Sequence, residues 1–168
     1  MFTNKEIFNA NNAYNNTEKV FVDTDVYIYF SRNYKPNTLL TVLDFGSGLF
    51  PSEALKLQSK GYNVTLHEFG NNFLPDVHSK VALDYKYDII LASNVINVQS
   101  SSNMLKLTLS LMADSLKAGG SIILNYPPYP NLLKLSKEEL EKIFSKFFSF
   151  KQIKKYNNLY KLQLLNSK

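Results

Sequence analysis

A glycine turn lies between two acidic residues in the stretch TVLDFGSGLFPSEALKLQSKGYNVTLHEFG. Asp44 ends a first apolar run just before Gly46, Ser47 and Gly48, and Glu68 ends a second apolar run twenty residues after Gly48. Glycine permits unusual backbone angles and lets a ligand lie against the main chain. A carboxylate at the end of a neighbouring strand can accept both hydroxyls of a ribose. The pattern therefore predicts a site for a ligand that contains a ribose.

The spacing of the glycines bears on the kind of cofactor. A dinucleotide pyrophosphate site favours the pattern G-x-G-x-x-G, but this chain has Pro51 at the third glycine position. Asp44 would also repel an anionic pyrophosphate, so an NAD-type site is disfavoured. A ligand with a ribose and a positively charged amino group suits both acids, and S-adenosylmethionine carries these groups together with a sulfonium cation. The structural alternative is that Asp44 and Glu68 are helix-capping or surface carboxylates.

Strand-like and helix-like segments alternate along the chain, which is the order of βαβ units in a mostly parallel sheet. The expected strands and helices are, in order, strand 39–45, helix 51–61, strand 62–69, strand 86–95, helix 100–120 and strand 121–126. In an open parallel sheet ligands bind at the carboxyl ends of the strands. Asp44 and Glu68 are expected at these ends.

The C-terminal part predicts a helix followed by an antiparallel hairpin. Ser136 and Glu139 form a capping-box pattern. Apolar residues then repeat at helical spacing and should face the core: Leu140, Ile143, Phe144, Phe147 and Phe148. Two alternating runs flank Asn157 and Asn158, which is a hairpin signal.

Five motifs in this order resemble the class I S-adenosylmethionine-dependent methyltransferases. VLDFGSG resembles the glycine-rich first motif, VTLHEFG the acidic second motif, and YDIILASNVINV the strand and loop beside the methyl group. LKAGGSIIL resembles the helix end and fifth strand, and the hairpin matches the reversed last strands. The resemblance implies an α/β, Rossmann-like class I methyltransferase fold. Its sheet is mostly parallel with a C-terminal antiparallel hairpin, and helices lie on both faces.

The resemblance also implies S-adenosylmethionine as the cofactor and a role for each motif residue. Asp44 would hold the methionine ammonium group, directly or through water. Gly46, Ser47 and Gly48 would pass close to the methionine part of the cofactor. Glu68 would bind the ribose hydroxyls.

Further cofactor contacts are implied beyond the first two motifs. Phe69 would pack on the adenine, and Ser93 and Asn94 would line the pocket floor near the sulfonium. An acid near the adenine is also expected, and Asp84 is the candidate, with a plain loop residue as the alternative. Only nineteen residues separate Glu68 of the second motif from Asp88 in the next strand, too few for the usual full helix and strand.

Three asparagines are candidates for holding the methyl acceptor. Asn125 lies in NYPPY, which resembles the N-P-P-Y motif of amino-methylating DNA enzymes, where the target base is flipped out and stacked. The match is imperfect, because a tyrosine is inserted and the motif follows a later strand. Asn94 and Asn97 lie in the stretch SNVIN (93–97), after residues 86–92 of the expected strand, with loop hydrogen bonding as the alternative. Methyl transfer to a good nucleophile depends largely on holding the acceptor in line.

Residues 1–37 are expected to form an N-terminal lid or acceptor-side segment beside a cofactor-binding domain at 38–168, and to contain a short helix and a strand at 25–31. The aromatic residues of this segment either form a lid or pack on the core: Tyr14, Tyr27, Tyr29, Phe30 and Tyr34. No target-recognition domain is evident. Acceptor choice would therefore come from this segment, from the loops at 94–102 and 126–134, or from a partner protein.

Composition limits the class of protein. The 168 residues are 45% apolar and 20% charged, without an apolar run long enough to span a membrane or a signal-peptide core, which predicts a soluble cytoplasmic protein. No cysteine is present, which excludes a covalent cytosine C5 mechanism, and with two histidines no metal site is expected. Residues 131–168 hold nine lysines against three glutamates. Such a basic segment can attract nucleic acid, although a solvated lysine-rich surface is the plainer interpretation.

Together these features predict an enzyme that transfers a methyl group from S-adenosylmethionine to a nucleic acid or a small molecule. The alternative is a non-catalytic or partner-dependent subunit that binds S-adenosylmethionine. The short chain, the compressed middle and the missing third glycine fit that alternative. A fainter resemblance links the chain to small methyltransferase-like proteins of bacterial DNA modification and defence.

Overall fold

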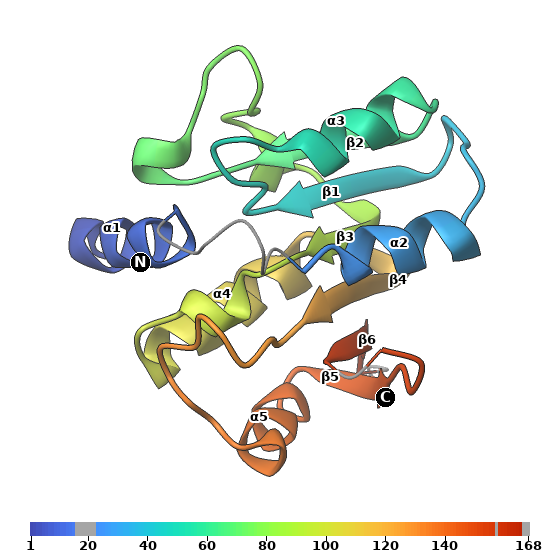
Figure 1. Ribbon diagram of the computed structural model, residues 1–168. Helices are drawn as coiled ribbons and strands as arrows, with labels where there is room; N and C mark the ends of the chain where they lie inside the picture. The colour runs from blue at the N-terminus through green and yellow to red at the C-terminus, as the bar shows by residue number, and fades with distance from the viewer. Residues whose placement is uncertain (16–22, 157, 166–168) are drawn as a thin grey trace.

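The computed structural model describes residues 1–15, 23–156 and 158–165, and within these ranges a six-stranded sheet has the order β2-β1-β3-β4-β6-β5 (Figure 1). Four strands run parallel: β1 (Thr41–Phe45), β2 (Asn63–His67), β3 (Tyr87–Ala92) and β4 (Leu116–Asn125). An antiparallel hairpin completes one edge: β5 (Phe148–Gln152) and β6 (Leu159–Leu164). The predicted α/β architecture with its closing hairpin is confirmed; Asn157 of the hairpin signal lies outside the described residues.

Helices cover both faces of the sheet, as predicted (Figure 1). One face packs against α2 (Asp25–Asn33) and α3 (Ser52–Ser59), and the other against α4 (Ser102–Asp114) and α5 (Lys137–Phe144). Because side chains alternate along a strand, Val42 enters the core under α2 and α3 while Leu43 enters the core under α4 and α5. In the part of the chain described here, no helix is both long and apolar enough to cross a membrane.

A further helix, α1 (Asn4–Asn15), lies beyond the carboxyl ends of the parallel strands (Figure 1). It contacts two short 3₁₀ segments, η2 (Gly70–Asn72) and η4 (Ile96–Val98). Ala10 packs there with Val98 and Met104 in a small third cluster. The N-terminal helix therefore lies at the end of the sheet where the ligand is expected.

The strand predicted at 25–31 is wrong, because this segment is α2. Its aromatic and β-branched residues favour a strand by propensity, but tertiary packing overrides such preferences. The helix buries Val26 and Phe30, four residues apart, against the sheet. It also directs Tyr27 to the end of β1, where the Tyr27 hydroxyl bonds to Asp44.

The helix predicted at 100–120 ends six residues early, at Asp114, and the following residues begin β4. Ser101 caps its start as expected, with the Ser101 Oγ accepting from the Met104 N–H at 3.1 Å. The glycine pair does not end the helix. It lies in β4 where the register with β3 shifts, and a Cβ on Gly120 would come within 3.0 Å of the carbonyl oxygens of Lys117 and Asp88. Glycine is needed there for close backbone approach, which a pattern alone does not distinguish from a helix stop.

The capping box of α5 is confirmed. The Glu139 N–H donates to the Ser136 Oγ at 3.1 Å, and the Ser136 N–H donates to the Glu139 carboxylate at 2.7 Å. The helix ends at Phe144, so the last two residues of the predicted stripe lie outside it. Phe147 and Phe148 nevertheless pack in the same core, Phe148 from β5.

Candidate functional site

A cavity of about 60 Å³ lies between α1 and the carboxyl ends of the parallel strands. Four residues that the sequence singled out line it: Gly46, Glu68, Phe69 and Asn94. Most of the remaining lining residues are apolar or aromatic: Phe2, Ile7, Ala10, Tyr14, Phe45, Val95, Val98 and Met104. The turn after β1, the end of β2 and the loop after β3 thus meet in one partly apolar pocket with a carboxylate in its wall.

Glu68 fastens the glycine turn to the end of β2. Its Oε2 accepts the Gly48 N–H at 2.7 Å, and its Oε1 accepts the Phe69 N–H at 2.7 Å. Burial raises the pKa of Glu68, and the two backbone N–H groups act in the opposite direction. A carboxylate oxygen has more than one acceptor site. Both oxygens are therefore held in place and can still accept hydroxyl groups from a ligand.

The turn favours glycine at positions 46 and 48, since Gly46 and Gly48 have φ angles of 66° and 85°. A Cβ on Gly46 would lie 3.0 Å from Val95, and a Cβ on Gly48 would lie 3.2 Å from the ring of Tyr14. Ser47, between them, donates its N–H to the His67 carbonyl at 2.9 Å. The turn is thus fixed against β2, and a side chain from α1 lies directly on it.

Asp44 is fully buried beside this turn, and it contributes no surface to the cavity. Both of its carboxylate oxygens lie 3.1 Å from the Tyr27 hydroxyl, which donates to them. Burial raises the pKa of Asp44 to about 8, the Tyr27 hydrogen bond lowers it, and the charge of Glu68 raises it. Within the described residues no ion pair includes Asp44. A buried carboxyl group without a cation is costly to ionise, so an arriving ammonium group would stabilise its charged form.

Tyr14 lines the cavity from α1. Burial raises the pKa of Tyr14, and the charges of Asp44 and Glu68 act in the same direction. Its ring contacts Gly48. Tyr14 therefore occupies space directly beside the glycine turn, on the cavity side.

Side-chain amide contacts hold α1 over the cavity, which we call its closed position. The Asn11 amide donates to the Phe69 carbonyl at 3.0 Å and to the Asn71 side chain at 2.8 Å. Asn15 and Asn72 exchange two side-chain hydrogen bonds, at 3.0 and 3.3 Å. These side-chain hydrogen bonds act together with the packing of Ala10 against Val98 and Met104.

Phe69 presents an aromatic surface to the cavity, as expected for a residue that packs on a flat ring. Its ring centroid lies 4.3 Å from that of His67, 5.4 Å from that of Phe2 and 5.8 Å from that of Phe45, all in edge-to-face geometry. Burial lowers the pKa of His67 to about 4, so His67 is neutral in this aromatic cluster.

Asn94 and Asn125 bind each other. The Asn94 N–H donates to the Asn125 Oδ1 at 2.6 Å, and the Asn125 Nδ2 donates to the Asn94 Oδ1 at 3.0 Å. Asn94 has a φ of 58° and lines the cavity, whereas Asn125 is fully buried and does not. Ser93 and Asn94 also donate to the Asp23 carbonyl, each at 3.1 Å. Asn125 thus supports the loop after β3 rather than facing an acceptor.

Asn97 connects two loops instead of reaching the cavity. Its Nδ2 donates to the Pro130 carbonyl at 2.7 Å, and its carbonyl accepts the Leu132 N–H at 2.9 Å. The Asn97 side chain is fully buried, and among the described residues its Oδ1 has no hydrogen-bond partner. Its place indicates that it anchors the loop at 126–134.

We expect Asn125→Ala to lower the free energy of unfolding by about 2–3 kcal/mol, because it leaves the polar groups of Asn94 buried without partners. Urea unfolding monitored by circular dichroism measures this. Asn63→Ala is the control, since Asn63 makes a single exposed bond to the Thr38 carbonyl, and it should cost less than about 1 kcal/mol. Equal small losses in both variants would contradict the supporting role of Asn125.

Asp84 is not brought to this site. It ends η3 (Ala82–Asp84), is exposed, and precedes the amino end of β3, whereas the cavity lies at the carboxyl ends. The compressed chain between β2 and β3 explains this placement, because it forms short turns instead of an additional strand with a carboxyl end beside β2. Among the described residues no group of three or more acidic or histidine side chains could hold a metal ion.

Three residues near the glycine turn were missed as parts of the site. Tyr14 and Tyr27 were expected only as lid or core residues, and His78 only as one of two imidazoles too few for a metal site. The His78 Nε2 lies 3.1 Å from the Gly48 carbonyl oxygen. Each reaches the turn from a distant part of the chain, and no local pattern indicates such contacts.

No protein-family model and no curated protein matches the chain by sequence. Solved structures do resemble it. A TehB-like SAM-dependent methyltransferase from Corynebacterium glutamicum is 13% identical, with 92% of this chain and 93% of that chain covered and a TM-score of 0.63. DesVI from Streptomyces venezuelae is 11% identical, with 98% and 100% covered and a TM-score of 0.60. TehB from Haemophilus influenzae is 14% identical, with 91% and 65% covered and a TM-score of 0.55.

At these identities the likeness concerns the fold alone. The strand order and the reversed closing strands agree with it. The chain therefore has the class I methyltransferase fold that its motifs predicted.

Proposed function

We propose that the protein binds S-adenosylmethionine in the cavity under α1 and transfers its methyl group to an acceptor. One observation carries the proposal. The Glu68 carboxylate, in the cavity wall at the end of β2, is hydrogen-bonded to the N–H of the glycine turn after β1. A carboxylate in this position suits a ribose, and the adjacent aromatic surface of Phe69 suits an adenine.

Different residues would bind different parts of the cofactor. Glu68 would accept the ribose hydroxyls, Phe69 would pack on the adenine, and Asp44 would stabilise the methionine ammonium group from beneath the turn. Gly46 and Gly48 would leave room for the ligand along the main chain. When bound, S-adenosylmethionine supplies an electrophilic methyl group, and the protein orients the acceptor toward it.

The N-terminal segment would act as a lid on this site. A cavity of about 60 Å³ is far smaller than the roughly 300 Å³ or more that a cofactor pocket occupies. The Tyr14 ring, beside Gly48, would stand in the path of a ligand that lies along the turn. Binding therefore requires α1 to move outward, so we propose that α1 is the lid within residues 1–37, whereas α2 stays packed on the sheet.

The acceptor would approach through a surface groove on the other side of α1. This groove, of about 820 Å³, lies between α1 and the loop at 128–134. Asn9 and Asn12 line it from the helix, and Tyr129, which is 64% exposed, lines it from the loop. We propose a ring-bearing acceptor for the groove, either a nucleobase or a small molecule, because an exposed aromatic ring beside amide groups suits stacking and hydrogen bonding.

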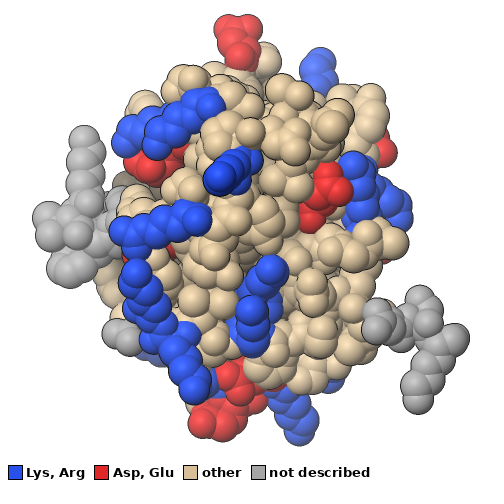
Figure 2. All heavy atoms as spheres, turned by 90° about the vertical axis from the view of Figure 1, so that its right-hand side faces the viewer, with Lys and Arg blue, Asp and Glu red and all other residues tan. Residues whose placement is uncertain are grey.

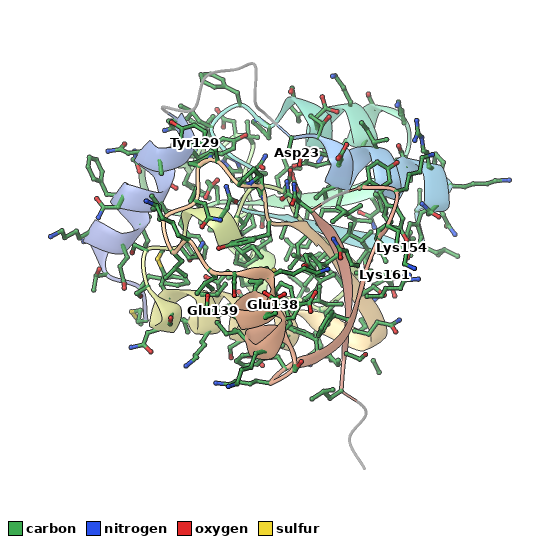
Figure 3. The ribbon with its side chains drawn as sticks, turned by 60° about the horizontal axis from the view of Figure 1, so that its bottom comes forward. Asp23, Tyr129, Glu138, Glu139, Lys154 and Lys161 are labelled. Atoms are coloured by element: carbon green, nitrogen blue, oxygen red, sulfur yellow. The ribbon has the colours of Figure 1, made fainter. Side chains whose placement is uncertain are left out.

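The distribution of charge bears on the choice between these acceptors. On the face opposite α1, lysine and arginine side chains are spread among uncharged and acidic ones (Figure 2). Figure 3 shows Tyr129 on the side of α1, whereas Lys154 and Lys161 lie on the other side of the view. Part of the basic excess of residues 131–168 therefore lies away from the groove, although Lys134 lines it, so a nucleic acid in the groove would meet only part of this charge.

The proposal is tested by incubating the protein with S-adenosylmethionine labelled in its methyl group and with separate acceptor pools: single-stranded DNA, duplex DNA, RNA and a small-molecule extract. We expect transfer into one pool, lost in Glu68→Ala. Binding of the cofactor without transfer into any pool would contradict catalysis by the chain alone. It would support the partner-dependent alternative. The position of Tyr14 beside the glycine turn also favours that alternative.

A further inference from the structure

The short connection between β2 and β3 lies against the edge of the sheet and reaches back to the glycine turn. Its chain folds tightly at residues 74–78, where the N–H groups of Val77 and His78 both donate to the Leu74 carbonyl, at 3.0 and 2.8 Å. The Ser79 N–H then donates to the Leu66 carbonyl of β2 at 2.9 Å. These bonds place the side chain of His78, which is 3% exposed, under the turn.

Both ring nitrogens of His78 have a defined role. The Nδ1 accepts the Leu74 N–H at 2.8 Å. The Nε2 lies 3.1 Å from the Gly48 carbonyl oxygen, which can only accept. His78 is therefore a neutral imidazole with its proton on Nε2, because only this form satisfies both neighbours at once.

Gly48 is consequently held from both sides. Its N–H donates to Glu68 at 2.7 Å, and its carbonyl accepts from His78 at 3.1 Å. Gly48 has no side chain that could restrain the turn by packing. Its φ of 85° lies in the left-handed region that favours glycine. The two hydrogen bonds, from β2 and from the connection after it, therefore fix the turn.

We propose that His78 is a positioning residue of the cofactor site. Its Nε2–H holds the Gly48 carbonyl, which keeps the Gly48 N–H directed at Glu68 and thereby orients the Glu68 carboxylate for the ribose hydroxyls. This inference rests on the proposed function, since it concerns the same cofactor. It gives the compressed connection a function, because this connection supplies the second restraint on the turn.

Two substitutions test the roles of the two His78 ring nitrogens separately. In His78→Asn an amide oxygen can replace the Nδ1 acceptor for Leu74, but the donor to Gly48 is lost. In His78→Gln an amide nitrogen can replace the Nε2 donor to Gly48, but the acceptor for Leu74 is lost. Each variant loses one buried hydrogen bond, so similar losses of stability are expected, whereas only His78→Asn should disturb the turn.

The first readout is the affinity for S-adenosylhomocysteine and for its 2′-deoxy analogue, measured by calorimetry. We expect His78→Asn to bind S-adenosylhomocysteine about tenfold more weakly than wild type, and His78→Gln within about threefold of it, given one unpaired buried group. The preference for the 2′-hydroxyl should shrink in His78→Asn and persist in His78→Gln. A merely structural role would lower both affinities equally and leave the preference unchanged.

The second readout needs no cofactor. Hydrogen exchange of the Gly48 amide, followed by NMR, should be at least about tenfold faster in His78→Asn than in wild type or His78→Gln. Unchanged exchange and an unchanged 2′-hydroxyl preference in His78→Asn would overturn the role of His78 while leaving the proposed function intact. Failure of the folded wild type to bind S-adenosylhomocysteine would overturn the proposed function, and with it any role of His78 in that site.

Discussion

Asp44→Asn is expected to stabilise the free protein at alkaline pH. Burial raises the pKa of Asp44 from 3.8 to about 8. The folded state therefore keeps a proton that the unfolded state releases, and the free energy of unfolding falls as pH rises from about 4 to about 8. The loss is on the order of a few kcal/mol, at about 1.4 kcal/mol for each unit of pKa difference. Asparagine resembles the protonated carboxyl group and cannot ionise, so the variant avoids this loss.

Urea unfolding at pH 5 and pH 9 measures the effect, with the difference between wild type and Asp44→Asn isolating this one group. We expect wild type to lose more stability than the variant between the two pH values. Parallel losses would show that Asp44 does not carry the buried proton.

The same substitution should weaken cofactor binding by about a hundredfold or more, because removing one partner of a buried ion pair typically costs 3–5 kcal/mol. A gain in stability together with a loss of binding would show that the site retains a costly buried acid for its ligand. Unchanged affinity for S-adenosylhomocysteine in Asp44→Asn would contradict the ammonium-binding role.

A disulfide that fixes α1 in its closed position is expected to abolish cofactor binding. A Cβ built on Gly70 lies 3.8 Å from the Ile7 Cβ, and disulfides have a mean Cβ–Cβ separation of about 3.8 Å. The double variant Ile7→Cys with Gly70→Cys also removes the Ile7 Cγ2, which would otherwise lie 2.6 Å from the new Cβ. Since the chain has no cysteine of its own, only this pair can form within one molecule.

Calorimetric titration with S-adenosylhomocysteine compares the oxidised and reduced forms of the double variant. We expect no measurable binding in the oxidised form and recovery on reduction. Ile7→Cys alone, treated with the same oxidant, is the control for oxidation and for the lost side chain. Binding of equal strength in both forms of the double variant would contradict the lid, since it would show that the cofactor enters without movement of α1.

The fold was predictable where local patterns and packing agree. TVLDF and YDIILA are apolar runs buried on both faces of the sheet, and they form β1 and β3. The capping box at Ser136 marks the start of α5 because its two hydrogen bonds join residues three apart. Residues 25–31 were misassigned because their aromatic content favours a strand. The contacts that favour a helix are those of Val26 and Phe30 with α3 and one face of the sheet, which come from later parts of the chain.

The site was predictable to the extent that it is built from strand ends. Gly46 and Glu68 follow apolar runs directly, and parallel pairing of β1 with β2 brings the two strand ends together. The residues that complete the site come from elsewhere. Tyr14 arrives on α1, Tyr27 on α2 and His78 on a turn after β2, and each is placed by tertiary packing that the sequence around it does not encode.

The most direct test of the account is calorimetric titration of S-adenosylhomocysteine into the wild type and Glu68→Ala. Glu138→Gln, at an exposed position on α5, is the matched control. We predict micromolar binding by the wild type and the control, weakened at least about tenfold in Glu68→Ala because charge-assisted hydrogen bonds contribute about 1.5–3 kcal/mol each. No binding by the folded wild type, or equal binding by all three proteins, would contradict the claim that Glu68 holds the ribose of this cofactor.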